Sequence, residues 1–409
     1  MERTSTALDT ERIPEMFGVA HAHGGVPSEA AADATPLDIT SGTGTEQAAA
    51  SRIGDADRPL RIGMVAPVWV PIPPKGYGGV EWIVHSLVEG LGDRGHDVTL
   101  VSSGDSTTHA GHRFTTYDEA PYRRMGEPLP ELIHAVEAYR ELGDCDVIHD
   151  HTLAGPAMAQ MLERSGGPAV VHTVHGPVIP EVRRYYADCS ATNLVAISDA
   201  QQLTAPELNW AGTVHNGIDV SSFPFRADDD GYIAVLARMN PDKGIPEAIK
   251  LARELGLPIR IAAKLNEPAE LDYYRRVIEP LLGLGAEYVG ELQTAEKKEF
   301  LANARALAFP IQWDEPFGLA MIESLACGTP VLAIARGSVP EIVSDGLNGV
   351  TAANIDELID ACMQGIDHID PYLCRSDAES RFDITAMVDG YEAQYRRLAA
   401  SRSAFSAAA

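Results

Sequence analysis

Strand-like apolar runs alternate with amphipathic helical stretches along most of this chain, and the alternation occurs twice. The first series begins with RIGMVAPVWV at residue 61 and continues through DVTLVSS, DVIHDH, AVVHTVHG and NLVAIS. The second series begins with YIAVLAR at residue 232 and continues through PIRIAAKL, AEYVGE, ALAFPI, PVLAIA and GVTA. Strands that are separated by helices form parallel sheets, because the chain has to cross back before the next strand begins. The pattern therefore predicts two doubly wound α/β domains.

The domain boundaries follow from the same pattern. Residues 1–58 carry ten acidic and four basic residues with no sustained period, which predicts a disordered extension. We expect a Rossmann-like domain over residues 59–222, a second one over residues 223–383, and a C-terminal helix and tail over residues 384–409. Ligands of doubly wound sheets bind beyond the carboxyl ends of the strands, so a cleft between the two domains is the expected site.

Composition narrows the classes of partner. The formal net charge of -27 argues against binding to nucleic acid and against stable association with an anionic membrane. Five cysteines without C-x-x-C spacing indicate reduced thiols and neither a disulfide framework nor a zinc site. No apolar run reaches the roughly 18 residues of a membrane span, and the first residues lack the features of a signal peptide. We expect a soluble cytoplasmic protein that acts on small molecules.

The segment WDEPFGLAMIESLACGTPVLA, residues 313–333, places two glutamates around a predicted helix start. Pro316 suits the first helical position because it has no N–H to lose, and the free amides of residues 317–319 can meet an anion such as a diphosphate. Glu315 precedes this helix, and Glu323 would lie about 10 Å along its axis. The two carboxylates can then accept hydrogen bonds from a hexose and a ribose on either side of the phosphates. The alternative is a helix with an acidic first turn and a solvent-facing glutamate.

Two cations follow a strand of the second series. Arg238 ends YIAVLAR, and Lys243 lies in the loop that follows. Side chains at this edge of a parallel sheet face the ligand, and two cations there can neutralise a diphosphate. Solvation at the surface is the alternative for either residue taken alone.

A glycine-rich loop lies between a strand and a helix in PPKGYGGVEWIV. At Gly76, Gly78 and Gly79 the missing side chains would let the backbone approach a phosphate closely. A tight turn without a ligand is the alternative. The absence of G-x-G-x-x-G argues against a nicotinamide-binding domain.

Histidines gather near strand ends in VIHDH and VVHTVHG. Because side chains alternate along a strand, His149 and His151 share one side of the sheet, as do residues 173 and 175. A structural role and a zinc site are the alternatives, although no zinc-binding spacing is present. Farther along, Ser198 is placed to cap a helix, with Gln201 completing a capping box.

Taken together, these motifs resemble the retaining glycosyltransferases of family 4, which have the GT-B fold. Residues 313–333 are similar to the E-x7-E signature of that family, and ARMNPDKG is similar to its G-R-x-x-x-x-K-G, with Ala237 in place of the first Gly. PPKGYGG resembles the amino-terminal signature of a smaller bacterial group. The resemblance covers about residues 60–400.

The resemblance implies a role for each matching residue. Glu315 and His151, the second histidine of an H-x-H pair, would contact the transferred sugar. Glu323 would bind the ribose, and Arg238 and Lys243 the diphosphate. The other implied donor contacts are Gly78, Gly79, His175, Asn216, Lys264, Phe317, Gly318 and Leu319.

The resulting expectation is a metal-independent retaining hexosyltransferase without a cofactor. It would take a nucleotide diphosphate sugar as donor and a small soluble molecule as acceptor. Retention could come from double displacement, with Glu315 as nucleophile, or from front-face attack, in which Glu315 only orients the sugar. A sugar-nucleotide epimerase, a phosphorylase and a non-catalytic sugar-nucleotide binder are the alternatives on the same scaffold.

Overall fold

The computed structural model describes residues 58–76, 78–109, 111–164 and 166–408. The described residues all belong to one compact unit, Ala56–Ala409. The extension predicted for residues 1–58 therefore lies outside them, except for Arg58. The guanidinium of Arg58 donates two hydrogen bonds to the carboxylate of Asp146, at 2.9 and 3.0 Å.

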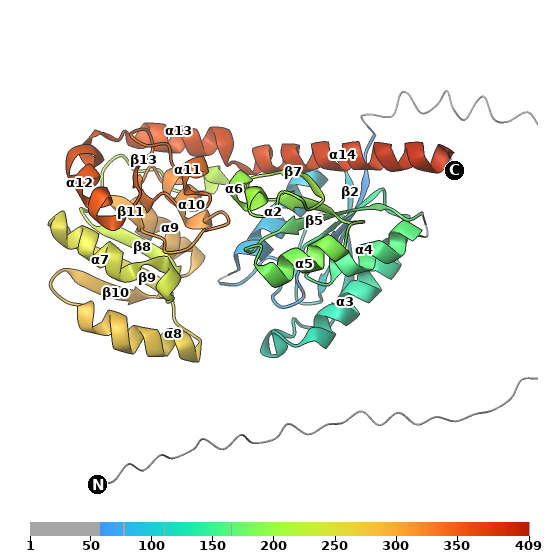
Figure 1. The fold of residues 1–409 in the computed structure, drawn as a ribbon, viewed down its shortest axis with the longest axis horizontal. Helices are drawn as coiled ribbons and strands as arrows, with labels where there is room; N and C mark the ends of the chain where they lie inside the picture. Colours follow the sequence, from blue (N-terminus) through green and yellow to red (C-terminus); the bar gives the residue numbers. More distant parts are fainter. Residues whose placement is uncertain (1–57, 77, 110, 165, 409) are drawn as a thin grey trace, which may run out of the picture. The chain divides into compact units, whose positions relative to one another are not determined.

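The first sheet contains seven parallel strands in the order β3-β2-β1-β4-β5-β6-β7 (Figure 1). Its order reverses beside β1, as in doubly wound folds. The elements in chain order are β1 (Arg61–Val65), α2 (Gly79–Asp93), β2 (Asp97–Ser103), β3 (His112–Tyr117), α3 (Pro128–Glu141), β4 (Val147–Asp150), α4 (Gly155–Arg164), β5 (Ala169–Val174), α5 (Pro180–Asp188), β6 (Asn193–Ala196), α6 (Asp199–Leu203) and β7 (Trp210–Thr213).

Apolar side chains fill both faces of this sheet, which is why its central strands read as nearly continuous apolar runs. Ile62 and Met64 of β1 belong to a cluster with buried residues of α2. Val65, one position on, belongs to a separate cluster with residues of α3 and α4. A Cβ at Gly63 would lie 2.6 Å from Cδ1 of Leu142, so this strand position has no room for a side chain.

The second sheet contains six parallel strands in the order β10-β9-β8-β11-β12-β13. The two parallel-sheet α/β domains predicted from the sequence are confirmed. The elements in chain order are β8 (Ile233–Arg238), α7 (Ile245–Glu254), β9 (Ile259–Lys264), α8 (Pro268–Tyr273), β10 (Ala286–Gly290), α9 (Thr294–Ala302), β11 (Ala306–Phe309), α10 (Leu319–Ala326), β12 (Val331–Ile334), α11 (Val339–Ile342), β13 (Gly349–Ala352), α12 (Ile355–Gly365) and α13 (Pro371–Arg381).

The last helix, α14 (Ile384–Ala408), follows the second sheet in sequence but packs on the first (Figure 1). Tyr391 and Tyr395 of α14 are fully buried in the cluster that contains the β1 residues. The Tyr395 hydroxyl lies 2.6 Å from Nδ1 of His149, and the Tyr391 hydroxyl lies 2.8 Å from Oγ1 of Thr173. The C-terminal helix thus completes the core of the first domain and hydrogen-bonds its strands β4 and β5.

Three elements of the first domain were not predicted, namely β3, α5 and β7. Strands β3 and β7 are the two edges of the sheet, and neither contains a buried residue. Helix α5 buries only Tyr186. Because these elements bury so little, their sequences lack the apolar run or stripe from which secondary structure is read.

Helix α6 is capped from both domains. Oγ of Ser198 accepts a hydrogen bond from the N–H of Gln201 at 3.1 Å, as predicted. The other half of the predicted capping box is wrong by one residue, because the Gln201 side chain accepts from the N–H of Ile197. The carboxylate of Glu341, in α11, accepts from the first two amides of α6, at 2.8 and 2.6 Å. A negative charge at a helix N-terminus is favourable, so this contact holds α6 to the second domain.

Candidate active site

Helix α10 carries Glu323 and begins later than predicted. Its first residue is Leu319, and Gly318 is the N-cap with φ of 85°. The expectation that Pro316 occupies the first helical position is therefore wrong. The left-handed conformation of Gly318 turns the chain into the helix, and a Cβ there would lie 2.8 Å from Cε of Met321. Glu323 consequently lies only about 6 Å along the axis from the first helical residue.

The loop before α10 is fixed by the loop that follows β12. The N–H of Ser338 donates to the carbonyl of Glu315 at 2.9 Å, and its Oγ donates to the carbonyl of Phe317 at 2.7 Å. A Cβ at Gly337 would lie 2.4 Å from the carbonyl oxygen of Glu315, so only glycine allows this approach. The backbone that presents Glu315 is thereby held in place before any ligand binds.

Lys243 and Glu315 form an ion pair. Nζ of Lys243 lies 2.6 Å from Oε2 of Glu315, and Nε1 of Trp313 donates to the same oxygen at 3.0 Å. Only 20% of the Lys243 side chain and 12% of the Glu315 side chain are exposed, so water screens the pair weakly. A Cβ at Gly244 would lie 2.0 Å from the carbonyl oxygen of Pro310, which explains why glycine follows the lysine.

Arg238 stands at the carboxyl end of β8 and pairs with the start of α8. Its Nη2 lies 2.8 Å from the carboxylate of Glu267 and 3.0 Å from that of Glu270. Lys264, which ends the neighbouring strand β9, lies 3.8 Å from Glu267. The two glutamates form the capping box of α8. Arg238 and Lys264 therefore share one acidic group at the same edge of the second sheet.

Glu323 has a partner that the sequence did not reveal. Nζ of Lys297, in α9, lies 2.6 Å from Oε1 of Glu323. Only 11% of the Glu323 side chain is exposed. The alternative prediction, in which this glutamate faces solvent, is therefore wrong. No spacing in the sequence links two residues on separate helices. Lys297 could therefore be recognised only once α9 and α10 were placed side by side.

The glycine-rich loop meets the start of α10. A Cβ at Gly79, the first residue of α2, would lie 3.1 Å from Cδ1 of Leu319. The structure thus brings together two of the predicted donor contacts, which are 240 positions apart in the sequence. Gly78 has a packing reason of its own, because a Cβ there would lie 2.8 Å from Pro74 and 2.9 Å from Oε2 of Glu81.

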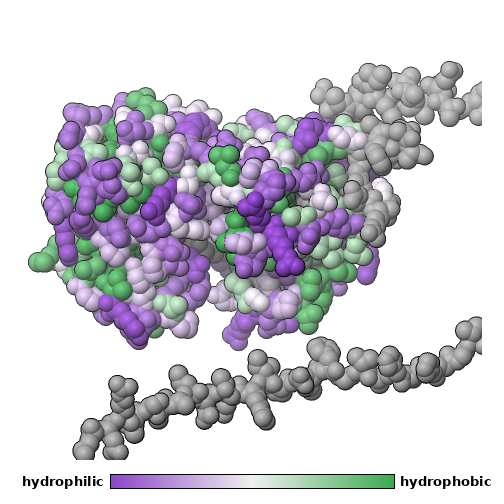
Figure 2. Space-filling model, viewed as in Figure 1, coloured by the Kyte–Doolittle hydropathy of each residue, from purple (hydrophilic) through white to green (hydrophobic). Residues whose placement is uncertain are grey.

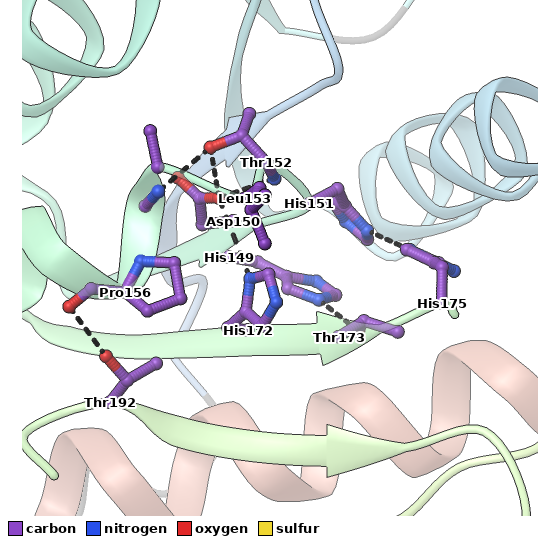
Figure 3. Close-up of polar contacts among 12 residues, drawn as sticks. His149, Asp150, His151, Thr152, Leu153, Pro156, His172, Thr173, His175 and Thr192 are labelled. Carbon is purple, nitrogen blue, oxygen red and sulfur yellow. Dashed lines mark hydrogen bonds and ion pairs between the residues drawn. The ribbon is translucent and has the colours of Figure 1, made fainter. Parts of the chain in front are cut away.

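His151, which was expected to contact the sugar, and His175, which was expected to contact the donor, are bonded to each other. Nδ1 of His151 lies 2.8 Å from Nε2 of His175, and Nε2 of His151 lies 3.2 Å from Sδ of Met64 (Figure 3). The neighbouring His149 lies 2.7 Å from Oγ1 of Thr173. His149 and His151 therefore share a side with residues 173 and 175, as the strand period predicts. His172 lies on the other side, against Asp150 and Tyr186.

Burial sets the charge state of these histidines. Removal of its ring from water lowers the pKa of His175 to about 3, and burial also lowers the pKa of His149 and His151. All three are therefore neutral at physiological pH, and one nitrogen of the His151–His175 pair donates while the other accepts. A neutral imidazole can accept a hydrogen bond from a sugar hydroxyl without placing charge in the site.

The lowered histidine pKa values predict acid sensitivity. An unfolded histidine takes up a proton near pH 6.5, whereas buried His149 does so only at a lower pH. The free energy of unfolding should thus be fully retained above pH 6.5 and fall as the pH is lowered below it. Urea denaturation between pH 7 and 5 should show this decrease. The slope of the free energy of unfolding against pH reports the number of protons taken up on unfolding, and in His149→Gln that number should be smaller by up to one. The control is His112→Gln, which changes an exposed histidine. Equal slopes in the two variants would contradict the lowered pKa of His149.

Asn216 is buried in the crossing from the first domain to the second. It is 4% exposed, and its Oδ1 has no hydrogen-bond partner within the described residues. Burying an amide oxygen without a hydrogen-bond partner costs free energy unless a ligand or a water molecule supplies the missing hydrogen bond. The adjacent His215 ring packs against Phe317, with 5.8 Å between ring centroids. Asn216 is thus close in sequence to a residue that touches the loop before α10.

No three histidine, cysteine, aspartate or glutamate side chains in the described part of the chain are placed to hold a metal ion together. The helices that the structure describes also include none that is both long and apolar enough to cross a bilayer.

Two family models match the chain. The model named Glycosyltransferase Family 4 matches residues 77–222, and the model named Glycosyl transferases group 1 matches residues 220–367. The first range contains the glycine-rich loop and the histidine pair. The second contains Arg238, Lys243 and both glutamates.

Curated relatives carry related activities. The phosphatidyl-myo-inositol mannosyltransferase of Mycolicibacterium smegmatis is 27% identical over 70% of this chain and 79% of its own. The D-inositol 3-phosphate glycosyltransferase of the same organism is 25% identical over 84% of this chain and 92% of its own. With the two family models, these similarities identify the chain as a glycosyltransferase.

Solved structures agree on the fold. Sucrose-phosphate synthase from Thermosynechococcus elongatus superposes with a TM-score of 0.70, at 18% identity, over 84% of this chain and all of its own. Anabaena HepE in complex with UDP-glucose superposes with a TM-score of 0.62, at 17% identity, over 81% of this chain and 98% of its own. The particular architecture is therefore GT-B, as expected.

Proposed function

We propose that this glycosyltransferase moves a hexosyl group from a nucleotide diphosphate sugar to a small soluble acceptor with retention of configuration. The observation that carries the proposal is the arrangement around α10. Its first turn meets the glycine loop, and the two glutamates of the E-x7-E segment are each paired with a lysine. A donor of this class is the ligand in the Anabaena complex.

Donor binding would use the helix start and the cations. The amides of Gly318, the N-cap, and Leu319, the first helical residue, have no partner within the helix and favour an anion. The diphosphate would lie there, with Phe317 just before them. Lys243 and Arg238 would exchange their glutamate partners for phosphate oxygens. Glu323 would bind the ribose hydroxyls, with Lys297 holding its carboxylate in place.

The transferred sugar would lie between Glu315, His151 and His175. Nε1 of Trp313 donates to Oε2 of Glu315 and would keep this bond after Lys243 turns to the phosphates, which weakens the carboxylate as a nucleophile. This favours front-face attack, in which Glu315 orients the sugar and the leaving phosphate accepts the proton of the incoming hydroxyl. Arg238 and Lys243 would stabilise the charge that develops on that phosphate.

The acceptor would enter from the first domain. A cavity of about 390 Å³ is lined by Val178, Pro180 and the arginines 183 and 184 of α5. Val178 is three positions after His175, so the cavity lies on the segment that leaves the histidine pair. Glu207 also lines this cavity and its carboxylate pairs with Arg183, so Arg184 is the guanidinium that would suit an acceptor with an anionic group. The name of the D-inositol 3-phosphate glycosyltransferase indicates such an acceptor for that relative.

The glycine loop provides a matched pair of variants. A methyl group at Gly79 would crowd Leu319, whereas a Cβ at Gly76 of the same loop would meet nothing within 4 Å. Gly79→Ala is expected to raise the KM for the donor about fivefold, because overpacking costs roughly 1 kcal/mol or more. Gly76→Ala should leave it unchanged, and Leu319→Ala should partly restore the Gly79→Ala variant. Equal KM values for the two alanine variants would contradict this role of Gly79.

Incubation with UDP- and GDP-sugars, with and without candidate acceptors, tests the function. The expected result is release of the nucleoside diphosphate, slow without acceptor and fast with one, and a product whose anomeric configuration by NMR matches that of the donor. An isomerised sugar nucleotide would indicate an epimerase instead. Tight binding without turnover would indicate a sugar-nucleotide binder. An inverted product would contradict retention.

A further inference from the structure

Helix α11 holds the loop before α10 with one residue and a helix of the first domain with another. Ser338, its N-cap, is fully buried and holds the backbone carbonyls of Glu315 and Phe317. Three positions on, the carboxylate of Glu341 accepts from the first two amides of α6, so α11 and α6 lie side by side (Figure 1). The backbone that presents Glu315 is thereby linked to the first domain through a single short helix.

The next residue of α6 extends this link to the histidine pair. Gln201 is 4% exposed, and its Nε2 donates to the carbonyl of Val174 at 2.7 Å and to that of Gly176 at 2.8 Å. These two carbonyls belong to the residues on either side of His175. The Gln201 side chain therefore fixes the backbone that presents His175, on the first-domain side of the site.

We propose that Ser338, Glu341 and Gln201 form one hydrogen-bonded bridge across the active site, and we call these three residues the α6–α11 bridge. The bridge sets the distance between Glu315 and His175. The inference rests on the proposed function, in which the transferred sugar lies between these two side chains. Neither Glu341 nor Gln201 touches the substrate, so each is a positioning residue for the transfer.

Further contacts brace the α6–α11 bridge. Nε2 of His215 lies 3.1 Å from Oε2 of Glu341, and the His215 ring packs against Phe317. Oε1 of Gln201 accepts from the N–H of Ile197 at 2.9 Å, which leaves this side chain no rotational freedom. Buried, fully bonded polar groups are rigid, so the bridge holds its geometry before a substrate arrives.

The same backbone leads to the proposed acceptor cavity. Val178 and Pro180, which line that cavity, follow Gly176 by two and four positions. Figure 2 shows hydrophilic residues gathered over α5, the helix that begins at Pro180. A shift of α6 would thus move both His175 and the entry of the acceptor. The cations and Glu323 would stay in place, because they belong to the second domain.

Two variants break the α6–α11 bridge at different points. Glu341→Gln turns an amide nitrogen toward one of the two α6 amides, and Gln201→Met keeps the length of the side chain without its hydrogen bonds. Each should lower kcat about 10-fold or more, because a displacement of about 1 Å from the reacting geometry can cost on the order of 100-fold in rate. The dissociation constant of the donor's nucleoside diphosphate, measured by calorimetry, should change by less than about twofold.

The matched controls carry the same two substitutions outside the bridge. Glu357, in the first turn of α12, accepts from Asn354 within the second domain, and Gln202, in α6, accepts from Thr213 within the first. Glu357→Gln and Gln202→Met should each keep kcat within about twofold, because neither side chain links the two domains. Circular dichroism and thermal denaturation confirm that each variant is folded.

The double variant Glu341→Gln/Gln201→Met tests whether the two residues act as one unit. Its kcat should be no lower than that of the slower single variant, because either change breaks the same bridge. Unchanged kcat in both single variants, or losses that multiply in the double variant, would overturn the proposal. So would a dissociation constant for the nucleoside diphosphate that rises as much as kcat falls.

Hydrogen exchange separates failure of the bridge from failure of the proposed function, because it needs no substrate. Glu341→Gln should speed exchange of the first α6 amides about 10-fold or more, followed by mass spectrometry of peptides that contain residues 199–203. Glu357→Gln should leave it unchanged. Equal exchange in Glu341→Gln and the unaltered chain would overturn the bridge, whatever reaction the enzyme catalyses. Faster exchange, combined with no transfer by the unaltered chain, would support the bridge and contradict the proposed function.

Discussion

Replacement of Lys243 by alanine is expected to lower kcat/KM by about 100- to 1,000-fold, the usual effect of removing one preorganised donor from a developing negative charge. Nζ of Lys243 is held 2.6 Å from Oε2 of Glu315, on a segment fixed by Gly244 and next to the proposed diphosphate site. Loss of the amine removes positive charge where the leaving phosphate would form. Steady-state kinetics with the donor identified by product release provide the measurement.

Lys250 is the matched control for this experiment. It lies on α7, the helix that follows Lys243, and its 48% exposed side chain pairs with Asp356. Lys250→Ala should keep its activity within about twofold, because exposed ion pairs contribute little. If both alanine variants keep full turnover, or if Lys243→Ala loses activity only because it is unfolded, the assigned role is wrong. Thermal denaturation of each variant distinguishes the second case.

The largest expected effect on stability is at Tyr395, which joins α14 to the first domain. This side chain is fully buried, and its hydroxyl bonds Nδ1 of His149 at 2.6 Å. Tyr395→Ala should lower the free energy of unfolding by about 3 to 5 kcal/mol through the cavity that it leaves. Tyr395→Phe keeps the ring but leaves a buried imidazole nitrogen without its partner, for a loss of about 1 to 3 kcal/mol.

Urea denaturation followed by circular dichroism measures both losses. Met363→Ala, which removes an exposed side chain of α12, should change the free energy of unfolding by less than about 0.5 kcal/mol. A Tyr395→Ala variant as stable as Met363→Ala would show that α14 does not contribute to the core of the first domain. Loss of stability in Tyr395→Phe equal to that in Tyr395→Ala would assign the whole effect to the hydrogen bond.

The sequence predicted those parts of the fold that bury an apolar face. The central strands of both sheets appear where the apolar runs are, because each is covered by helices on both sides. The edge strands β3 and β7 were missed because no buried side chains mark them. The start of α10 was misplaced because Pro316 is typical of a first helical residue, whereas the left-handed Gly318 decides where the helix begins.

The candidate site was predictable where chemistry follows local sequence and was not where it depends on distant contacts. Arg238 at the end of β8 and the shared side of His149 and His151 follow from strand geometry alone. The pairing of Lys297 with Glu323 does not, because it joins two helices whose approach is set by the whole second domain. The glutamates of α8 that hold Arg238 were missed for the same reason.

A crystal structure with a bound nucleotide diphosphate sugar, the donor chosen by a thermal-shift screen, tests whether the start of α10 binds the diphosphate. The expected structure has a diphosphate at the first turn of α10, with Arg238 and Lys243 turned from their glutamates to the phosphates and Glu323 on the ribose. A donor bound away from α10, with the Lys243–Glu315 pair unchanged and no contact to Glu315 or Glu323, would contradict this proposal.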